Sequence, residues 1–402
     1  MSSTTSRSKL SIFAFVILIT VVFVIVVIVT HHNVTAPYPG HNDFMSRWEG
    51  ARSYWIDGLN PYGEQASLNI QERIYGRPAS LNEDPGFFAY PFYTVFIIAP
   101  LVLTDYAWAS AFWMVLLEAC LIGALVLQLN LLRWKPTPIL LGVLLIYSIF
   151  DYFAWRGLVL GQPGLLVYAL EIIAIWAYFR NRDALGGVAL ALSTLKPQMG
   201  FLIVPLLLLI ALRYRRWRLV GAFAVTFGIL AGAAFILQPS WLGDWLAQVG
   251  NYSSYTALGS PVWIITQYYL GLGTAGEWAL NLPLIALMLW GWYAVIIQRK
   301  SERLLWTIAL TLTVTHLIAP RTATPHYVVF MLPILFYLRG FAMHRQTLIA
   351  VVIPVGILVI TWVHFLNTVQ GEFEHPTVYL PLPFAILILL IITRKRWWSF
   401  TP

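Results

Sequence analysis

One polar segment, residues 31–90, carries the groups in this chain that are best suited to chemistry. It holds seven of the seventeen carboxylates, although only 10% of the 402 residues are charged and 59% are hydrophobic. Asp43 follows the apolar N-terminal stretch and falls in the first turn of an expected helix. An aspartate in that position would stay ionised, as a general base must. The alternative is a helix cap, or a charge that the helix dipole favours.

Two expected helix breaks supply further polar groups. Lys196 precedes Pro197 between two short apolar stretches. A cation beside the backbone groups that a proline frees is a candidate anion site in a membrane protein, and a lysine that snorkels from a span end is the alternative. Arg156 and Gly161-Gln162-Pro163-Gly164 mark the second break, for which an ordinary interfacial loop is the competing interpretation.

A third group lies around a short connection that contains Arg321 and His326. Such a pair would bind a phosphate or a sugar hydroxyl, whereas a histidine bonded to a carbonyl would be purely structural. Glu118 and Glu171 fall within apolar stretches, where a carboxylate is either functional or a single hydrogen-bonding group. The run Glu372-Phe373-Glu374-His375 lacks a recognised metal-ligand spacing, and the sequence has no Asp-x-Asp pair, glycine-rich phosphate loop or nucleophile elbow.

The elements that position these residues are apolar helices. Long hydrophobic runs indicate an all-α polytopic membrane protein, because backbone groups in lipid must be hydrogen-bonded within their own helix. We expect about 11–13 transmembrane helices in a single membrane domain. Its parts are an uncleaved first span at 10–30, the polar loop at 31–90, the remaining bundle at 91–393 and a tail at 394–402. Cys120 is the only cysteine, so no intrachain disulfide is possible.

Within the polar loop, apolar residues follow a helical period. Phe44, Trp48, Ala51 and Trp55 recur at spacings of four, three and four. This stripe predicts a helix that lies flat at the membrane interface, and Gly58 is a suitable stop for it.

The basic residues predict the orientation of the chain. The clusters around Arg213, Arg299 and Arg394 fall in the cytoplasm, with both termini, if the helices alternate from residue 278 onward. The polar loop is then outside, and so are three further segments: 239–260, 320–325 and 367–376.

Two schemes remain for the middle of the chain. In the first, 88–104 dips into the membrane without crossing, and 184–195 and 198–212 cross separately. In the second, 88–104 crosses and 184–212 is one helix. The distribution of basic residues favours the first scheme, which places Gln162 and Lys196 on the same side as the polar loop.

A series of short motifs runs across residues 10–340: Asp43, Tyr54, Gly58, Asn60-Pro61-Tyr62, Tyr90-Pro91, Gly161-Gln162, Lys196-Pro197, His326-Tyr327 and Pro333. Their order and spacing resemble glycosyltransferase family 87, the polyprenol-phosphate-dependent mannosyltransferases within the GT-C superfamily. Two departures concern the donor and acceptor more than the reaction class. The family's usual Tyr-Pro-Pro reads Tyr90-Pro91-Phe92, and Pro163-Gly164 replace a polar residue that often follows Gly-Gln.

The resemblance implies a GT-C-like bundle and an inverting transfer of a hexose, typically mannose. The donor would be a polyprenyl-phosphate sugar, and the acceptor a lipid or glycan. Asp43 matches the family's catalytic aspartate, which accepts the proton of the attacking hydroxyl, and His326 matches a histidine near the same centre. We expect Lys196, Arg156 and Arg321 to bind the donor phosphate. We expect Gln162, Tyr62, Tyr90 and Trp48 to contact the substrates.

The same resemblance implies where the protein works and what it needs. The active site would face the extracytoplasmic side of a bacterial plasma membrane, among membrane lipids. We expect no metal or other cofactor, because a lipid phosphate leaves well without one. We expect no nucleic-acid partner, because the basic residues stand at span ends. A multi-pass transporter or flippase of a lipid-linked or small polar substrate is the main alternative, although polarity concentrated outside the bundle favours an enzyme.

Overall fold

The computed structural model describes residues 3–38, 43–80, 83, 85–255, 259–371, 374–400 and 402, without the side chains of 3–12, 15 and 251–255. Every regular element in these ranges is a helix, which confirms the predicted all-α class. The first half comprises α1 (Ser3–Thr30), α2 (Asp43–Trp55), α3 (Glu64–Tyr75), α4 (Thr94–Ile98), α5 (Tyr106–Leu131), α6 (Pro138–Phe150), α7 (Tyr152–Leu160), α8 (Gly164–Phe179), α9 (Asp183–Leu192), α10 (Pro197–Gly200) and α11 (Ile203–Arg213).

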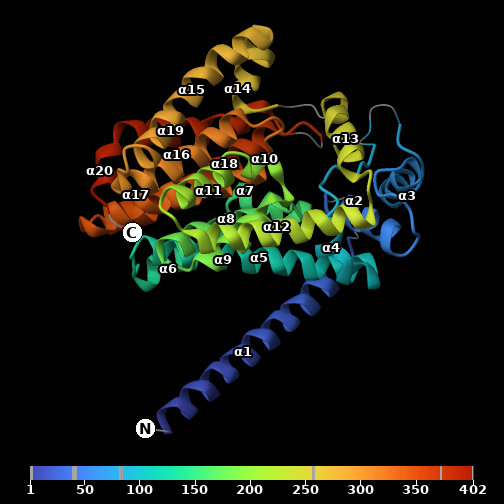
Figure 1. Cartoon of the computed structure of the whole chain (residues 1–402), viewed down its shortest axis with the longest axis horizontal. Helices are drawn as coiled ribbons and strands as arrows, with labels where there is room; N and C mark the ends of the chain where they lie inside the picture. Colours follow the sequence, from blue (N-terminus) through green and yellow to red (C-terminus); the bar gives the residue numbers. More distant parts are fainter. Residues whose placement is uncertain are drawn as a thin grey trace.

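The second half adds α12 (Trp217–Leu237), α13 (Trp241–Tyr255), α14 (Pro261–Trp263), α15 (Gly273–Ile296), α16 (Leu304–Ile318), α17 (Met331–Met343), α18 (Thr347–Thr368), α19 (Pro381–Ile392) and α20 (Arg394–Trp398). Short 3-10 or π turns join several of them: η1 (His31–Thr35), η2 (Ala99–Leu103), η3 (Ser193–Leu195), η4 (Ile264–Tyr269), η5 (Ser301–Arg303), η6 (Thr324–Phe330) and η7 (Pro376–Tyr379). Figure 1 shows α1 projecting from the bundle, with α2, α3 and α13 gathered at one end of it.

The lengths of the apolar helices fit a membrane protein. Among the described residues, six helices are long and apolar enough to cross a membrane, and the pair α6 and α7, bent by 47°, makes up to seven. Five further apolar helices are shorter. Together they give at most twelve crossings, so the predicted range of 11–13 is reached only in its lower part, and only if shorter helices cross as well.

The two topologies considered above differ in whether the segment 88–104 crosses the membrane, and its helix is short. The apolar helix over Thr94–Leu103, which is α4 with η2, measures roughly 15 Å at about 1.5 Å per residue, half of a hydrocarbon core of about 30 Å. This length fits a segment that dips in without crossing. Further along, the apolar helices Asp183–Leu195 and Ile203–Arg213 are separate, as the same scheme requires.

The structure confirms the helix predicted from the stripe in the polar loop, but the predicted location of the stripe is wrong. Phe44, Trp48 and Ala51 are no more than 2% exposed, and only Trp55 is open, at 41%. The Trp48 indole N–H donates to the Leu101 carbonyl at 3.0 Å. The stripe is therefore buried in the protein's own core and does not face lipid, because the chain folds back over α2 through η2 and α5.

Helix α13 lies against the polar loop (Figure 1). The Asn60 side-chain amide donates to Asp244 at 2.9 Å, and Gln248 donates to the Tyr62 carbonyl at 3.1 Å. Both contacts place α13, within the segment 239–260, on the side of the loop, as the charge pattern predicted.

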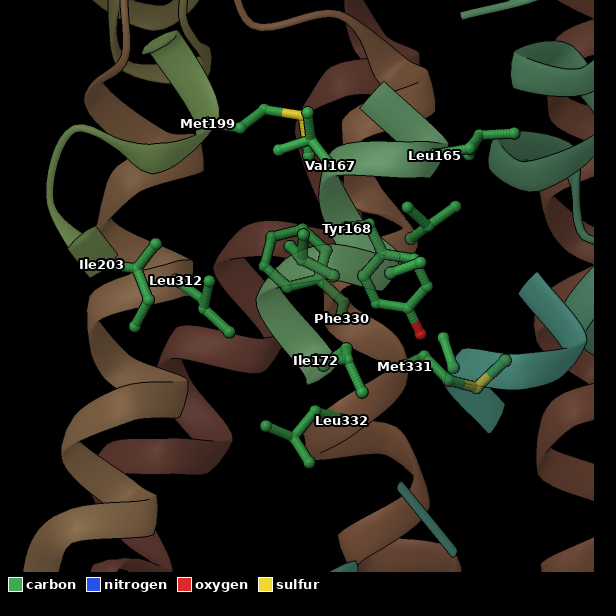
Figure 2. Close-up of a cluster of buried hydrophobic side chains, with 14 of the residues drawn as sticks. Leu165, Val167, Tyr168, Ile172, Met199, Ile203, Leu312, Phe330, Met331 and Leu332 are labelled. Carbon is green, nitrogen blue, oxygen red and sulfur yellow. The ribbon is translucent and has the colours of Figure 1, made fainter. Parts of the chain in front are cut away.

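The core that supports the site is built around α8. Figure 2 shows Tyr168 and Ile172 of α8 packed among side chains from α10, α11, α16, η6 and α17. Next to it, α9 packs tightly against α12. A Cβ added at Gly187 would lie 2.8 Å from the Ala222 Cβ and would collide with the Leu219 carbonyl oxygen.

The C-terminal tail is packed rather than free. Trp397 of α20 is fully buried and stacks on Phe336 with ring centroids 3.7 Å apart. Its indole N–H donates to the Tyr337 hydroxyl at 3.2 Å. These contacts hold α20 against α17, at the end of the bundle away from α2 and α3 (Figure 1).

Candidate active site

Asp43 lies close to the break after α7, where its neighbour Phe44 holds the start of α2. The Phe44 ring stacks on Trp113 of α5 with centroids 4.9 Å apart. The Trp113 indole N–H in turn donates to the Gly161 carbonyl at 2.8 Å. Gly161 ends α7 with φ +63°, in the left-handed region that suits glycine. The start of α2 is thereby fixed beside the break that carries Gln162.

Gln162 links Asp43 to Lys196. The Gln162 Nε2 group donates to Asp43 Oδ2, and Gln162 Oε1 accepts from Lys196 Nζ at 2.6 Å. Lys196 is 3% exposed and Gln162 is 6% exposed, whereas the Asp43 side chain is 38% exposed. The Gln162 amide therefore connects the accessible carboxylate of Asp43 to the buried ammonium group of Lys196. Pro197 causes the break at Lys196, because a proline has no backbone N–H with which to continue η3 and instead begins α10.

Tyr90 lies close to two cations. Its hydroxyl accepts a hydrogen bond from Arg47 Nη2 at 2.9 Å, and the Arg47 guanidinium lies 4.4 Å from the ring centroid. Lys196 Nζ lies 6.0 Å from the same centroid. Burial alone would raise the pKa of the Tyr90 hydroxyl, but the charges of Arg47 and Lys196 outweigh it and lower the pKa. The Tyr62 hydroxyl fixes the segment by donating to the Tyr90 carbonyl at 2.6 Å.

His326, in η6, lies against the start of α8, close to the same break. A Cβ added at Gly164 would lie 3.1 Å from His326 Cδ2 and 3.2 Å from Met199 Sδ. The His326 Nδ1 atom accepts from the Ala323 backbone N–H at 3.2 Å, so a neutral ring carries its proton on Nε2. That Nε2 atom is buried and has no hydrogen-bond partner within the described ranges. This N–H group can therefore donate a hydrogen bond to an oxygen of a bound substrate.

Two residues of this cluster were not among the sequence-based candidates. Arg47 follows Asp43 by one helical turn, with its Nη1 atom 4.0 Å from Asp43 Oδ1. The i, i+4 spacing was a usable signal for it. His316 is fully buried, 5.9 Å from His326 between ring centroids, and neither of its ring nitrogens has a hydrogen-bond partner in the described part of the chain. In the sequence, the only indication of its role was a histidine within an apolar stretch.

Arg156 occupies a neighbouring network. Its Nε atom lies 3.0 Å from Glu374 Oε1, which also accepts from the Tyr152 and Thr324 hydroxyls. The Tyr379 hydroxyl donates to Glu374 Oε2 at 2.9 Å. Thr324 opens the turn η6 that carries His326, so this network borders the site without a direct contact to Asp43 or Lys196 among the interactions above.

The structure also describes the other sequence-based candidates. Arg321 adopts φ +60° in the connection before η6. Trp48 is 2% exposed and serves the packing of α2. Glu118 is half-buried in α5, and Glu171 is buried in α8 with both carboxyl oxygens lacking a hydrogen-bond partner among the described residues. Their roles remain predictions.

No three His, Cys, Asp or Glu side chains in the described ranges gather as metal ligands would. Of the run Glu372-Phe373-Glu374-His375, the first two residues lie outside the described residues. The His375 ring contacts the Thr377 hydroxyl, with Nδ1 2.7 Å from its Oγ1.

A comparison with family models gives a match to Glycosyltransferase family 87 over residues 88–320, more than half of the chain. The matched region includes Tyr90, Arg156, Gln162 and Lys196, whereas Asp43 precedes it and Arg321 and His326 follow it. No curated protein and no solved structure gives a significant match. The break that carries Gln162 and the break that carries Lys196 thus fall in the family's own region, and the chain belongs to glycosyltransferase family 87.

Proposed function

We propose that this glycosyltransferase moves a hexose, with mannose as the first candidate, from a polyprenyl phosphate to a hydroxyl of a lipid or glycan acceptor. The active site would face the extracytoplasmic side. The observation that carries the proposal is the chain of hydrogen bonds from Asp43 through Gln162 to Lys196. In this chain the proposed proton acceptor, Asp43, and the proposed phosphate-binding cation, Lys196, bond to the same amide of Gln162.

The proposed reaction uses these groups in a single displacement. Asp43 takes the proton of the acceptor hydroxyl while the hydroxyl oxygen forms a bond to C1 of the sugar. The bond between C1 and the phosphate oxygen breaks on the opposite face, so the configuration at C1 inverts. The electron pair leaves with the polyprenyl phosphate. General-base help of this kind contributes roughly 10²–10⁴-fold in rate.

Lys196 is the proposed stabiliser of the departing phosphate. The ammonium group is 3% exposed, and a charge acts more strongly where water is excluded. The Nε2 atom of His326 would donate to a phosphate or sugar oxygen, and Tyr62 and Tyr90 would line the place of the sugar. Arg156 and Arg321 remain candidates for the outer part of the phosphate site.

Replacement of the buried lysine tests this assignment. Lys196→Ala removes the charge that would meet the donor phosphate, so the apparent KM for the donor should rise by about tenfold or more while the acceptor KM changes little. Lys135→Ala, at an exposed lysine, is the control and should leave both values unchanged. An unaltered donor KM in Lys196→Ala would contradict the role of this residue.

The donor class is tested with the purified protein in lipid. Incubation with radiolabelled polyprenyl-phosphate mannose and membrane lipids should transfer the label to an acceptor, with the configuration at C1 opposite to that of the donor. Parallel incubations with polyprenyl-phosphate glucose and with a nucleotide-activated mannose define the specificity. Transfer from the nucleotide sugar alone, or retention of configuration, would refute the proposal.

A further inference from the structure

A long apolar groove of about 490 Å³ runs between α17, α18 and α19. Its walls are mainly aliphatic and include Ile334, Ile357 and Ile386. From Pro381 at the start of α19 to Thr393 just after its end, the groove extends over roughly 18 Å at about 1.5 Å per residue. It is open at its side, since Ile360 in the lining is 69% exposed. This length is close to one leaflet of a hydrocarbon core about 30 Å thick.

The polar groups of the lining lie at the two ends and differ in what they offer a ligand. At the end near α7, the Thr361 hydroxyl donates to the Ile357 carbonyl, and His364 Nε2 lies 2.9 Å from the Thr377 hydroxyl. Both groups thus already have partners within the protein. This end offers no charged lining residue.

The opposite end carries an uncompensated cation. Arg396 lines the groove there, beside the hydroxyls of Tyr337 and Thr393, whose oxygens are 2.9 Å apart. No ion pair joins Arg396 to a carboxylate among the described residues, and no Asp or Glu lines the groove. Arg394 and Lys395 precede it on α20 and add to the positive charge.

We infer that the groove is a binding site for an anionic phospholipid. One acyl chain would lie along the aliphatic wall, and the phosphodiester would meet Arg396, with the Tyr337 and Thr393 hydroxyls as further partners. This occupant differs from the sugar carrier of the proposed reaction, whose phosphate must reach Lys196 and Asp43. The single charged lining residue stands at the end of the groove next to α20, which lies away from α2 (Figure 1).

Retention of defined lipids tests the inference. Native mass spectrometry of the purified full chain, titrated with phosphatidylglycerol, should show one tightly held lipid, and phosphatidylcholine should be held less well. Arg396→Gln should weaken phosphatidylglycerol binding by roughly five- to tenfold, the effect of one lost charged contact. Arg394→Gln removes the same charge two residues away but outside the lining, and should change binding by less than about twofold.

A second pair of variants tests the apolar part of the groove. Ala385→Trp on α19 fills the groove and should abolish the tightly held lipid, whereas Ile388→Trp on the same helix lies outside the lining and should not. Equal binding in Arg396→Gln and Arg394→Gln would overturn the inference. So would lipid retention in Ala385→Trp, or one-for-one displacement of phosphatidylglycerol by undecaprenyl phosphate.

Discussion

At the residue scale, Gln162 is the group that organises the site. Its amide nitrogen faces the carboxylate of Asp43 and its amide oxygen faces the ammonium group of Lys196. The reverse orientation would oppose two donors at Lys196 and two acceptors at Asp43. The charges on either side therefore fix the amide, and the amide fixes the spacing between the base and the cation.

The space next to His326 depends on the absence of a side chain at Gly164. Gly164→Ala would press a methyl group against His326 Cδ2 and Met199 Sδ, at 3.1 and 3.2 Å. Since a small displacement of a catalytic group lowers the rate steeply, we expect kcat to fall by roughly tenfold with little loss of folded protein. Gly123→Ala, which meets nothing within 4 Å, is the control. Equal kcat values for the two variants would show that His326 needs no such space.

Residue types, their positions and the family resemblance together predicted part of this cluster. Asp43, Gln162, Lys196, Tyr90 and His326 were chosen from the sequence, and the structure gathers them in one region. Their pairing was not predictable, because Asp43 and Gln162 are separated by 119 positions and meet only through the packing of α2 on α5. Arg47 and His316 were missed, since neither stands in a helix break or a short connection.

At the element scale, the contact between α9 and α12 positions the Lys196 break. Helix α9 leads through η3 directly to Lys196, so a displacement of α9 moves the cation. The contact depends on Gly187, where the backbone of α12 passes closely enough to exclude any side chain. Its neighbour Gly186 has ordinary space, with the nearest atom 3.4 Å from an added Cβ.

These adjacent glycines form a matched pair of variants. Gly187→Ala should destabilise the protein by about 1–3 kcal/mol, because the methyl group meets the Leu219 carbonyl and the Ala222 Cβ. Gly186→Ala should be close to neutral. Thermal unfolding in detergent measures both, and a Gly187→Ala melting temperature equal to that of Gly186→Ala would contradict the packing described here.

The sequence predicted helix positions better than helix surroundings. The period of Phe44, Trp48 and Ala51 correctly indicated an apolar face on the helix now seen as α2. A stripe of that kind satisfies a membrane interface and a protein core equally well. The choice depends on distant segments such as α5 and η2, which no local pattern reveals.

At the scale of the whole molecule, the site is assembled from parts that the chain brings to one end of the bundle. Asp43, Gln162 and Lys196 meet in one hydrogen-bonded chain, and α13 packs on the same polar loop. These contacts agree with the relative placement that the basic residues predicted. The side of the membrane on which this end lies remains a prediction.

Cysteine labelling tests that orientation. Cys120→Ser gives a cysteine-free background, and Glu64→Cys and Ser301→Cys then place single exposed thiols in α3 and η5. An impermeant maleimide added to intact cells should label Glu64→Cys only, because the polar loop is expected outside and the Arg299 cluster inside. Ser301→Cys should react only after the membrane is opened. Labelling of both from outside, or the reverse pattern, would contradict the orientation.

The central claim is that Asp43 accepts the proton of the acceptor hydroxyl. Asp43→Asn keeps the shape of the side chain but removes its basicity, and its effect on turnover is the most direct measurement. With the variant inserted and folded like the parent, the account predicts a loss of transfer from polyprenyl-phosphate mannose of at least about 10²-fold. Turnover by Asp43→Asn at the parent rate would contradict it.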